Sequence, residues 1–254
     1  MIEVVGGQAL ACPTAALFLG PHTLLIANGA AELPAGDWKR DLMRRGSSGS
    51  VTRIDLMGDA PDAVLAEQLA FPCGLARGGD GTAILVSEAW RHRVVAVRVD
   101  RPGPPREILG DLPAYPGQLS AAADGEIWMA LFAPRNQLVE FVLREPAYRQ
   151  RMVETIDPAY WIAPSLASGM SYLEPIQGGT RKKLNIMKPW APTWSYGLVV
   201  RCDAAAQPLA SFHSRADGHV HGVTSVCEWG GRLLAAAKGS GVIVELGVTS
   251  GVAA

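Results

Sequence analysis

The chain has 254 residues, of which 48% are hydrophobic and 19% are charged, and its formal net charge is -1. This composition supports a full hydrophobic core and argues against a disordered chain or a protein that wraps nucleic acid. Glycine, proline, asparagine and histidine interrupt the long uncharged stretches, so no membrane span is predicted. Because Glu3 stands where a secretory signal would carry basic residues, we expect no signal peptide and take the cytoplasm as the default location.

Short apolar runs rich in Val, Ile, Leu and Trp end at Gly, Asp or Pro, which is typical of strands and turns. Four strand-turn-strand units follow one another, at residues 12–28, 71–88, 115–130 and 221–236. Each is followed by a third strand, at residues 50–56, 93–100, 197–203 and 241–246. Pro72 and Pro116 lie 44 residues apart, close to the spacing of about 40–45 residues for four-stranded propeller blades. The sequence therefore predicts an all-β propeller.

The repeat divides the chain into four predicted blades within one domain. Their approximate bounds are residues 8–68, 69–111, 112–217 and 218–250. The third blade contains a long insertion, residues 134–192, that we expect to be partly helical. Asn136 is a predicted N-cap for a helix beginning near Leu138, and Pro146 can begin a second helix that extends through Met152. We expect these helices to cap the mouth of the propeller.

Four segments carry a resemblance to a known family: residues 85–94, 112–117, 124–128 and 229–234. In this order and spacing they resemble the strictosidine synthase-like β-propellers, which are distantly related to paraoxonases and gluconolactonases. The resemblance implies a propeller of the six-bladed type, of which this chain contains about four blades and lacks the first two. An open propeller exposes strand edges, which favours self-association.

The resemblance also bears on the reaction. Plant enzymes of this family use a glutamate as general base in a Pictet–Spengler condensation, and that position falls on Thr224. Because a threonine hydroxyl is no substitute for this base at neutral pH, we do not expect condensation. The first functional hypothesis is hydrolysis of a small ester or lactone, and the alternative is a non-catalytic propeller that binds a small ligand.

A metal site is the second implication of the resemblance. Paraoxonases and gluconolactonases hold a divalent metal, usually calcium, in the central channel through Asn, Asp and Glu oxygens, ligands that suit a hard cation. The corresponding positions include Asn28 and Gln118, whereas Cys73 and Gly117 stand where oxygen ligands are expected. The hypothesis is a divalent metal such as calcium bound by Asn28 and Gln118.

Two histidines, His219 and His221, are two residues apart, which would place them on one face of a strand. In that arrangement they would present a catalytic acid-base pair or hold a transition metal. The alternative is a turn whose histidines form hydrogen bonds to the next blade.

Further candidates lie at the end of the second strand of the second blade, at the end of the insertion and just after the insertion. Glu88 is either a catalytic base or an ion-pair partner of Arg91 or Arg93. Aromatic side chains suit an apolar small molecule, although core packing would also account for them. The candidate substrate-binding residues are Trp90, Trp190, Trp194 and Tyr196.

Overall fold

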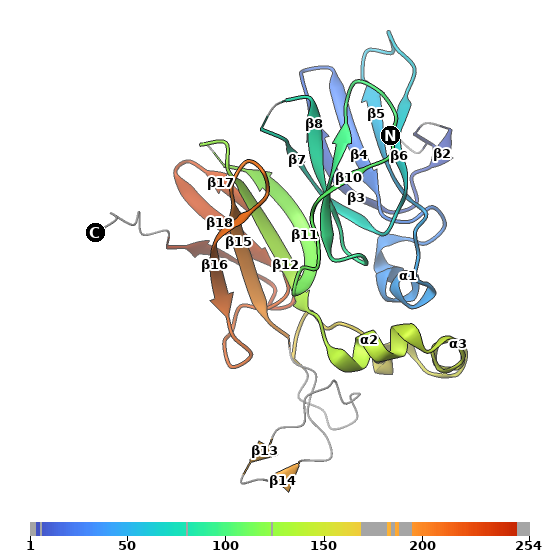
Figure 1. Cartoon of the computed structure of the whole chain (residues 1–254), viewed down its shortest axis with the longest axis vertical. Coiled ribbons are helices and arrows are strands. Elements are labelled where there is room, and N and C mark those ends of the chain that lie inside the picture. The colour runs from blue at the N-terminus through green and yellow to red at the C-terminus, as the bar shows by residue number, and fades with distance from the viewer. Residues whose placement is uncertain are drawn as a thin grey trace.

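The computed structural model describes residues 4–5, 7–79, 81–122, 124–168, 182–183, 186–187 and 195–247. Four antiparallel sheets stand around a common centre in a four-bladed β-propeller arrangement, which confirms the all-β propeller prediction (Figure 1). The six-bladed type stays a prediction. In chain order, blade 1 contains β3 (Pro13–Phe18), β4 (Thr23–Asn28), β5 (Gly49–Asp55) and β6 (Ala63–Leu69); blade 2 contains β7 (Pro72–Arg77), β8 (Ala83–Glu88), β9 (Arg93–Arg98) and β10 (Arg106–Leu109); blade 3 contains β11 (Ala114–Ala121), β12 (Ile127–Pro134), β15 (Gly197–Cys202) and β16 (Pro208–Ser214); and blade 4 contains β17 (Val223–Trp229), β18 (Arg232–Ala237) and β19 (Val242–Leu246).

Within each blade, a strand pairs with its nearest neighbour in the blade, and short turns make most of the connections. The β17–β18 hairpin shows why: its two loop residues, Gly230 and Gly231, both have positive φ (58° and 76°), as a tight hairpin turn requires. In blade 3, β12 pairs with β15 across the insertion. Two short hairpins are not part of the four blade sheets, β1 (Val4–Val5) with β2 (Gln8–Ala9) and β13 (Lys182–Lys183) with β14 (Ile186–Met187). Val5 of the first hairpin packs against blade 1.

Apolar side chains form a separate hydrophobic layer between each pair of neighbouring blades. Strand residues alternate between the two faces of a sheet, so the two middle blades, blades 2 and 3, each contribute to the layers on both of their sides. In β8, for example, Ile84 and Val86 pack toward blade 1, whereas Leu85 packs toward blade 3. Trp128 of β12 packs into the layer between blades 3 and 4, and its indole Nε1 donates to Glu228 at 2.7 Å. These layers fix the relative positions of the innermost strands.

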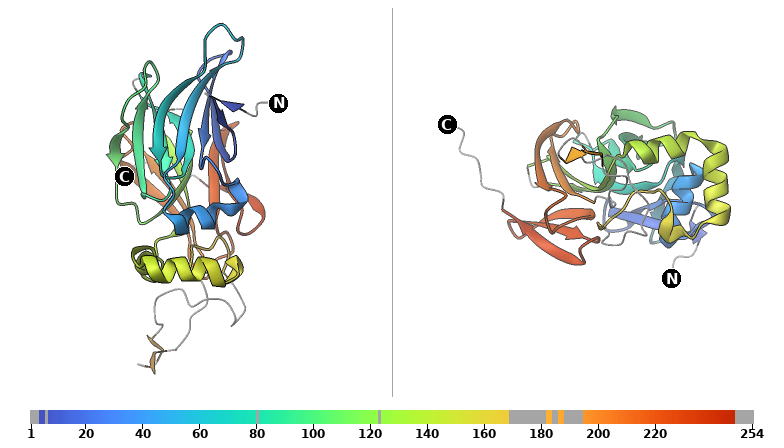
Figure 2. Two further views of the ribbon diagram at one scale, coloured as in Figure 1. Left: turned by 90° about the vertical axis from the view of Figure 1, so that its right-hand side faces the viewer. Right: turned by 90° about the horizontal axis from the view of Figure 1, so that it is seen from below.

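The helices gather at one end of the blades (Figures 1 and 2). They are α1 (Trp38–Arg44), α2 (Gln137–Arg144) and α3 (Pro146–Thr155), with 3-10 turns at Ala35–Asp37 and Pro158–Tyr160. The Asn136 side chain accepts a hydrogen bond from Leu138 N at 2.8 Å, so the predicted N-cap is confirmed. Pro146 begins α3, also as predicted. No helix in the described part of the chain is long and apolar enough to span a membrane.

A hydrophobic cluster joins the helices to the strand ends of blades 1 to 3. It contains Leu42 and Met43 of α1, Val142 of α2 and Met152 of α3. From the blades it takes Cys12, Phe71, Tyr115 and Phe132. The helices therefore help to form the rim beside the centre of the propeller.

Candidate functional site

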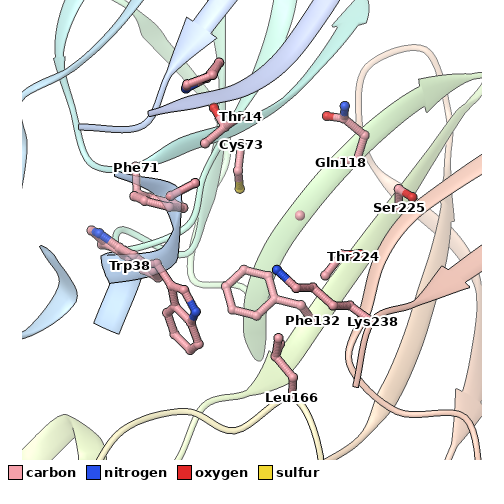
Figure 3. A pocket seen from close by; sticks show the side chains of 14 residues that line it. Thr14, Trp38, Phe71, Cys73, Gln118, Phe132, Leu166, Thr224, Ser225 and Lys238 are labelled. Carbon is pink, nitrogen blue, oxygen red and sulfur yellow. The ribbon is translucent and has the colours of Figure 1, made fainter. Parts of the chain in front are cut away.

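The innermost strands of the four blades, β3, β7, β11 and β17, line a central cavity of about 320 Å³ (Figure 3). The other described walls come from α1, from the ends of β8, β12 and β18, and from the segment after the helices. The lining includes Trp38, Phe71, Trp90, Phe132, Cys73, Gln118, Thr224, Ser225 and Lys238.

One wall of the central cavity is aromatic. The ring of Trp90 stacks on Phe71 with centroids 4.4 Å apart and on Trp38 at 6.1 Å. Phe132 meets Trp38 edge-on at 6.0 Å. Rings that pack on one another in this way offer a large apolar surface with little freedom to move.

A buried carboxylate orients this wall. Asp41 of α1 is 4% exposed, and its Oδ2 accepts a hydrogen bond from Trp90 Nε1 at 2.7 Å. Burial raises the pKa of the Asp41 carboxyl, and the hydrogen bond from Trp90 opposes that rise. Asp41 acts through Trp90 and is therefore a positioning residue.

Relative to wild type, the Asp41→Asn variant is expected to gain free energy of unfolding as pH rises above about 4, the ordinary pKa of an aspartate. Because its folded pKa is raised, wild type loses unfolding free energy between the unfolded and the folded pKa values, whereas asparagine does not titrate. Asparagine retains an oxygen that can accept from Trp90. Urea unfolding of both proteins, at acidic and at neutral pH, measures the shift; a difference that is the same at both would contradict it.

The opposite wall of the central cavity is polar. Gln118 Oε1 is buried and has no hydrogen-bond partner in the described part of the chain. Thr224 and Ser225 lie on β17, and Lys238 follows β18. In Figure 3 the Lys238 side chain extends toward Phe132. None of the described residues that line the cavity carries a carboxylate, so the ammonium has no acidic partner there.

Cys73 is not equipped to act as a nucleophile. Its Sγ donates to Pro116 O at 2.9 Å, and burial raises the pKa of the thiol to about 12. The thiolate is the reactive form of cysteine, so this side chain is inert at neutral pH.

The predicted metal ligands do not come together. Asn28 is buried, its Oδ1 accepts from Cys12 N at 2.8 Å, and it does not line the central cavity. Gln118 does, but the neighbouring Gly117 O already accepts from Ser87 Oγ at 2.6 Å. Calcium takes about six to eight oxygen ligands, and no group of three or more His, Cys, Asp or Glu side chains suited to a metal occurs among the described residues. These residues therefore do not fit a calcium site.

The structure corrects the expected placement of His219 and His221. Both lie in the loop between β16 and β17 rather than on a strand, so their side chains do not share a face; His219 is exposed and His221 is buried. His221 Nε2 lies 2.8 Å from Arg215 O, and a carbonyl only accepts, so Nε2 carries the proton. Nδ1 then accepts from Ser195 Oγ at 2.7 Å.

This Ser195–His221 contact was not predicted, because its partners are 26 residues apart and no sequence motif marks the serine. Its geometry resembles that of a nucleophile and its base. Ser195 is 0% exposed, however, and Ser168 Oγ also contacts it at 2.9 Å. The contact therefore holds the start of β15 against the loop before β17.

Glu88 is an ion-pair partner of Arg91 and Arg93, which was the alternative to a catalytic base. Its carboxylate is 0% exposed and accepts from Arg91 Nη1 at 2.8 Å, Arg93 Nε at 2.5 Å and Ala70 N at 2.7 Å. All of these contacts lie away from the central cavity.

The structure brings three of the predicted site residues, Trp90, Gln118 and Thr224, into the central cavity. Tyr196 does not line it, and its hydroxyl contacts His213 Nδ1 at 3.1 Å. Trp190 and Trp194 lie outside the described residues. Sequence reasoning missed the other rings of the aromatic wall and Lys238, although a lysine is rare enough in this arginine-rich chain to attract notice.

No model of a known protein family matches the chain. A stretch of 109 residues is 28% identical to the Arabidopsis thaliana protein strictosidine synthase-like 13, covering 42% of this chain and 27% of that protein. The chain resembles the strictosidine synthase-like proteins.

The fold is that of a solved gluconolactonase structure. A gluconolactonase from Xanthomonas campestris, described as important in glucose secondary metabolic pathways, superimposes with a TM-score of 0.50 at 13% identity, over 93% of this chain and 58% of that chain. A calcium-binding regucalcin from Agrobacterium tumefaciens superimposes with a TM-score of 0.47 at 14% identity, over 89% and 57%. The chain thus spans little more than half the length of these propellers.

Proposed function

We propose that this protein binds a small, largely apolar organic molecule in the central cavity. The observation that carries the proposal is the stacked wall of Trp38, Phe71 and Trp90, completed by Phe132, where the innermost strands meet. The cavity volume of about 320 Å³ lies at the small end of the usual range for ligand sites, about 300–1,000 Å³. Such a wall favours an aromatic or otherwise flat ligand.

Lys238 favours a ligand that carries a negative charge. Its ammonium group has no carboxylate partner among the described lining residues, and Thr224 and Ser225 line the same cavity. An anionic or strongly polarised oxygen of the ligand would complement these groups, because a hydrogen bond to a charged donor is stronger than a neutral one. The preferred ligand therefore has a flat apolar body and an anionic group, such as a carboxylate, at one end.

Replacing Lys238 with methionine is expected to weaken binding of an aromatic carboxylate such as 3-phenylpropanoate about tenfold, the loss that follows from one charge-assisted hydrogen bond. Methionine keeps the length and apolar stem of the side chain, so binding of the neutral 3-phenylpropanamide should hardly change. Isothermal titration of both compounds against both proteins measures the difference, with Lys238→Arg as the variant that keeps the charge. Equal losses for the acid and the amide would refute the role of the ammonium group.

Ester or lactone hydrolysis is the second candidate function. Lys238 together with the Ser225 hydroxyl could stabilise the oxyanion that develops when a carbonyl is attacked, whereas the Thr224 hydroxyl donates to Ala236 O. The fold that the chain shares with the gluconolactonase supports this candidate. No carboxylate or histidine among the described lining residues could act as the base, which supports the non-catalytic alternative.

A panel of aryl esters and lactones separates these two functions. Turnover that wild type shows and Lys238→Met loses would support hydrolysis in the central cavity. Binding of the carboxylate without turnover of any panel member would support the binding protein. If neither binding nor turnover depends on Lys238 or on Trp90→Ala, the proposed site is wrong.

A further inference from the structure

A second cavity, larger than the central one at about 620 Å³, lies at the helical end of blade 2. Its walls come from the end of α1, the β8–β9 turn and the helices α2 and α3, which lie close together in Figure 1. We call it the arginine cavity, because its described lining includes Arg44, Arg45, Arg91, Arg144 and Arg149.

Few carboxylates balance this charge. The buried Asp41 of α1 interacts electrostatically with Arg44 but forms no ion pair with it. Glu140 is the one acidic side chain in the described lining, and it already contacts His92 and Arg135, each at 3.4 Å. Arg91 is paired with the buried Glu88. No ion pair in the described part of the chain involves the remaining four, Arg44, Arg45, Arg144 and Arg149.

What distinguishes this recess is the gathering of its arginines, since single arginines without an ion pair also occur elsewhere in the described part of the chain. Arg93, Arg98, Arg135, Arg201 and Arg232 each pair with at least one carboxylate. The whole chain has a net charge of only -1. A local excess of four unpaired guanidinium groups in one recess is therefore not a consequence of a generally basic protein.

Local structure forces these side chains together. Arg45 is the C-cap of α1 and has a positive φ of 54°, which ends the helix beside α3. Arg149 of α3 donates through Nη1 to Leu143 O, at the end of α2. Partial burial lowers the pKa of the Arg149 guanidinium, and the nearby charge of Arg45 lowers it further. A bound anion would relieve this repulsion.

We propose that the arginine cavity binds the phosphate groups of a small phosphorylated molecule. A phosphate presents several acceptor oxygens and close to two negative charges at neutral pH, and guanidinium groups bind such oxygens two at a time. The recess admits a small phosphorylated compound, whereas a flat surface would suit a membrane. This site is separate from the central cavity, although Trp90 contributes to the walls of both.

Titration with pyrophosphate tests the proposal. Wild type is expected to bind it, with an affinity that falls as the salt concentration rises. Arg45→Gln and Arg149→Gln should each weaken binding about tenfold, since each removes charge-assisted hydrogen bonds. Arg151→Gln is the matched control: this exposed arginine lies on the same helix as Arg149, outside the described lining, and its loss changes the net charge by the same amount.

The outcomes are distinct. A loss of affinity in Arg149→Gln but not in Arg151→Gln supports the site, provided that both variants unfold at the wild-type urea concentration. Equal weakening by both variants would indicate general charge attraction and overturn the proposal. So would the absence of pyrophosphate binding by wild type, a result that needs no variant. Binding to phosphatidylcholine vesicles that contain phosphatidic acid, without binding of soluble pyrophosphate, would overturn it in favour of a lipid surface.

Discussion

Replacing Glu88 with alanine is expected to lower the free energy of unfolding by about 3 kcal/mol, the cost of removing one partner of a buried ion pair. The Glu88 carboxylate is fully buried and forms ion pairs with two guanidinium groups while it accepts from Ala70 N. Alanine would leave that amide without its partner and Arg93, which is 23% exposed, with only Glu107. The junction of β6, β8 and β9 should loosen as a result.

Glu107→Ala provides the control for this prediction. Glu107 contacts the same arginine, Arg93, at 3.0 Å, but its side chain is 52% exposed. Solvent screens exposed ion pairs, so this change should cost less than about 1 kcal/mol. Urea unfolding followed by tryptophan fluorescence gives both values. If the two variants lose similar stability, burial of Glu88 does not set its contribution.

Replacing Gly74 with alanine is expected to cost about 3 kcal/mol or more, because a rigid backbone meets the new methyl group. An added Cβ would lie 2.6 Å from Leu119 N and closer still to Gly117 O. Both are backbone atoms of β11, the innermost strand of the next blade, and Gly117 O already accepts from Ser87 Oγ, so a shift of β11 would disturb existing contacts. The close approach of β7 and β11 at the centre of the propeller therefore requires glycine here.

Gly103→Ala is the matched control, because an added Cβ at Gly103 would meet nothing within 4 Å. Its effect should stay within about 0.5 kcal/mol, as for most surface changes. The same samples can be titrated with 3-phenylpropanoate, since β7 and β11 both line the central cavity. If Gly74→Ala were as stable as wild type, the two blades could move apart here at no cost, and the prediction would be wrong.

The blades were predictable because their signals are local. A strand, a tight turn and a second strand recur along the chain, and neighbours within a blade are mostly neighbours in sequence. The same holds for the helices of the insertion, where Asn136 caps the helix that begins next to it. Thr224 was singled out through the family resemblance and Trp90 at the end of a predicted strand, and both line the central cavity.

The rest of the central cavity depends on contacts between distant segments. Trp38 comes from a helix inside blade 1, and Lys238 comes from the far end of the chain, so no repeat position marks either. Asn28 kept its place in the repeat, but its carboxamide is held by Cys12 N rather than turned to the centre. The interval of two residues between His219 and His221 predicted a shared face, which holds only on a strand.

The sequence by itself determined the all-β propeller, the succession of its strands and the position of its helical insertion. Strand alternation, turn residues and helix caps act over a few residues, and they are therefore visible in the order of the amino acids. Only the tertiary structure decided that an aromatic wall faces Lys238 and that unpaired arginines from three elements share one recess. Those arrangements arise from packing between segments far apart in the chain, where the local sequence specifies neither the partner nor the direction of a side chain.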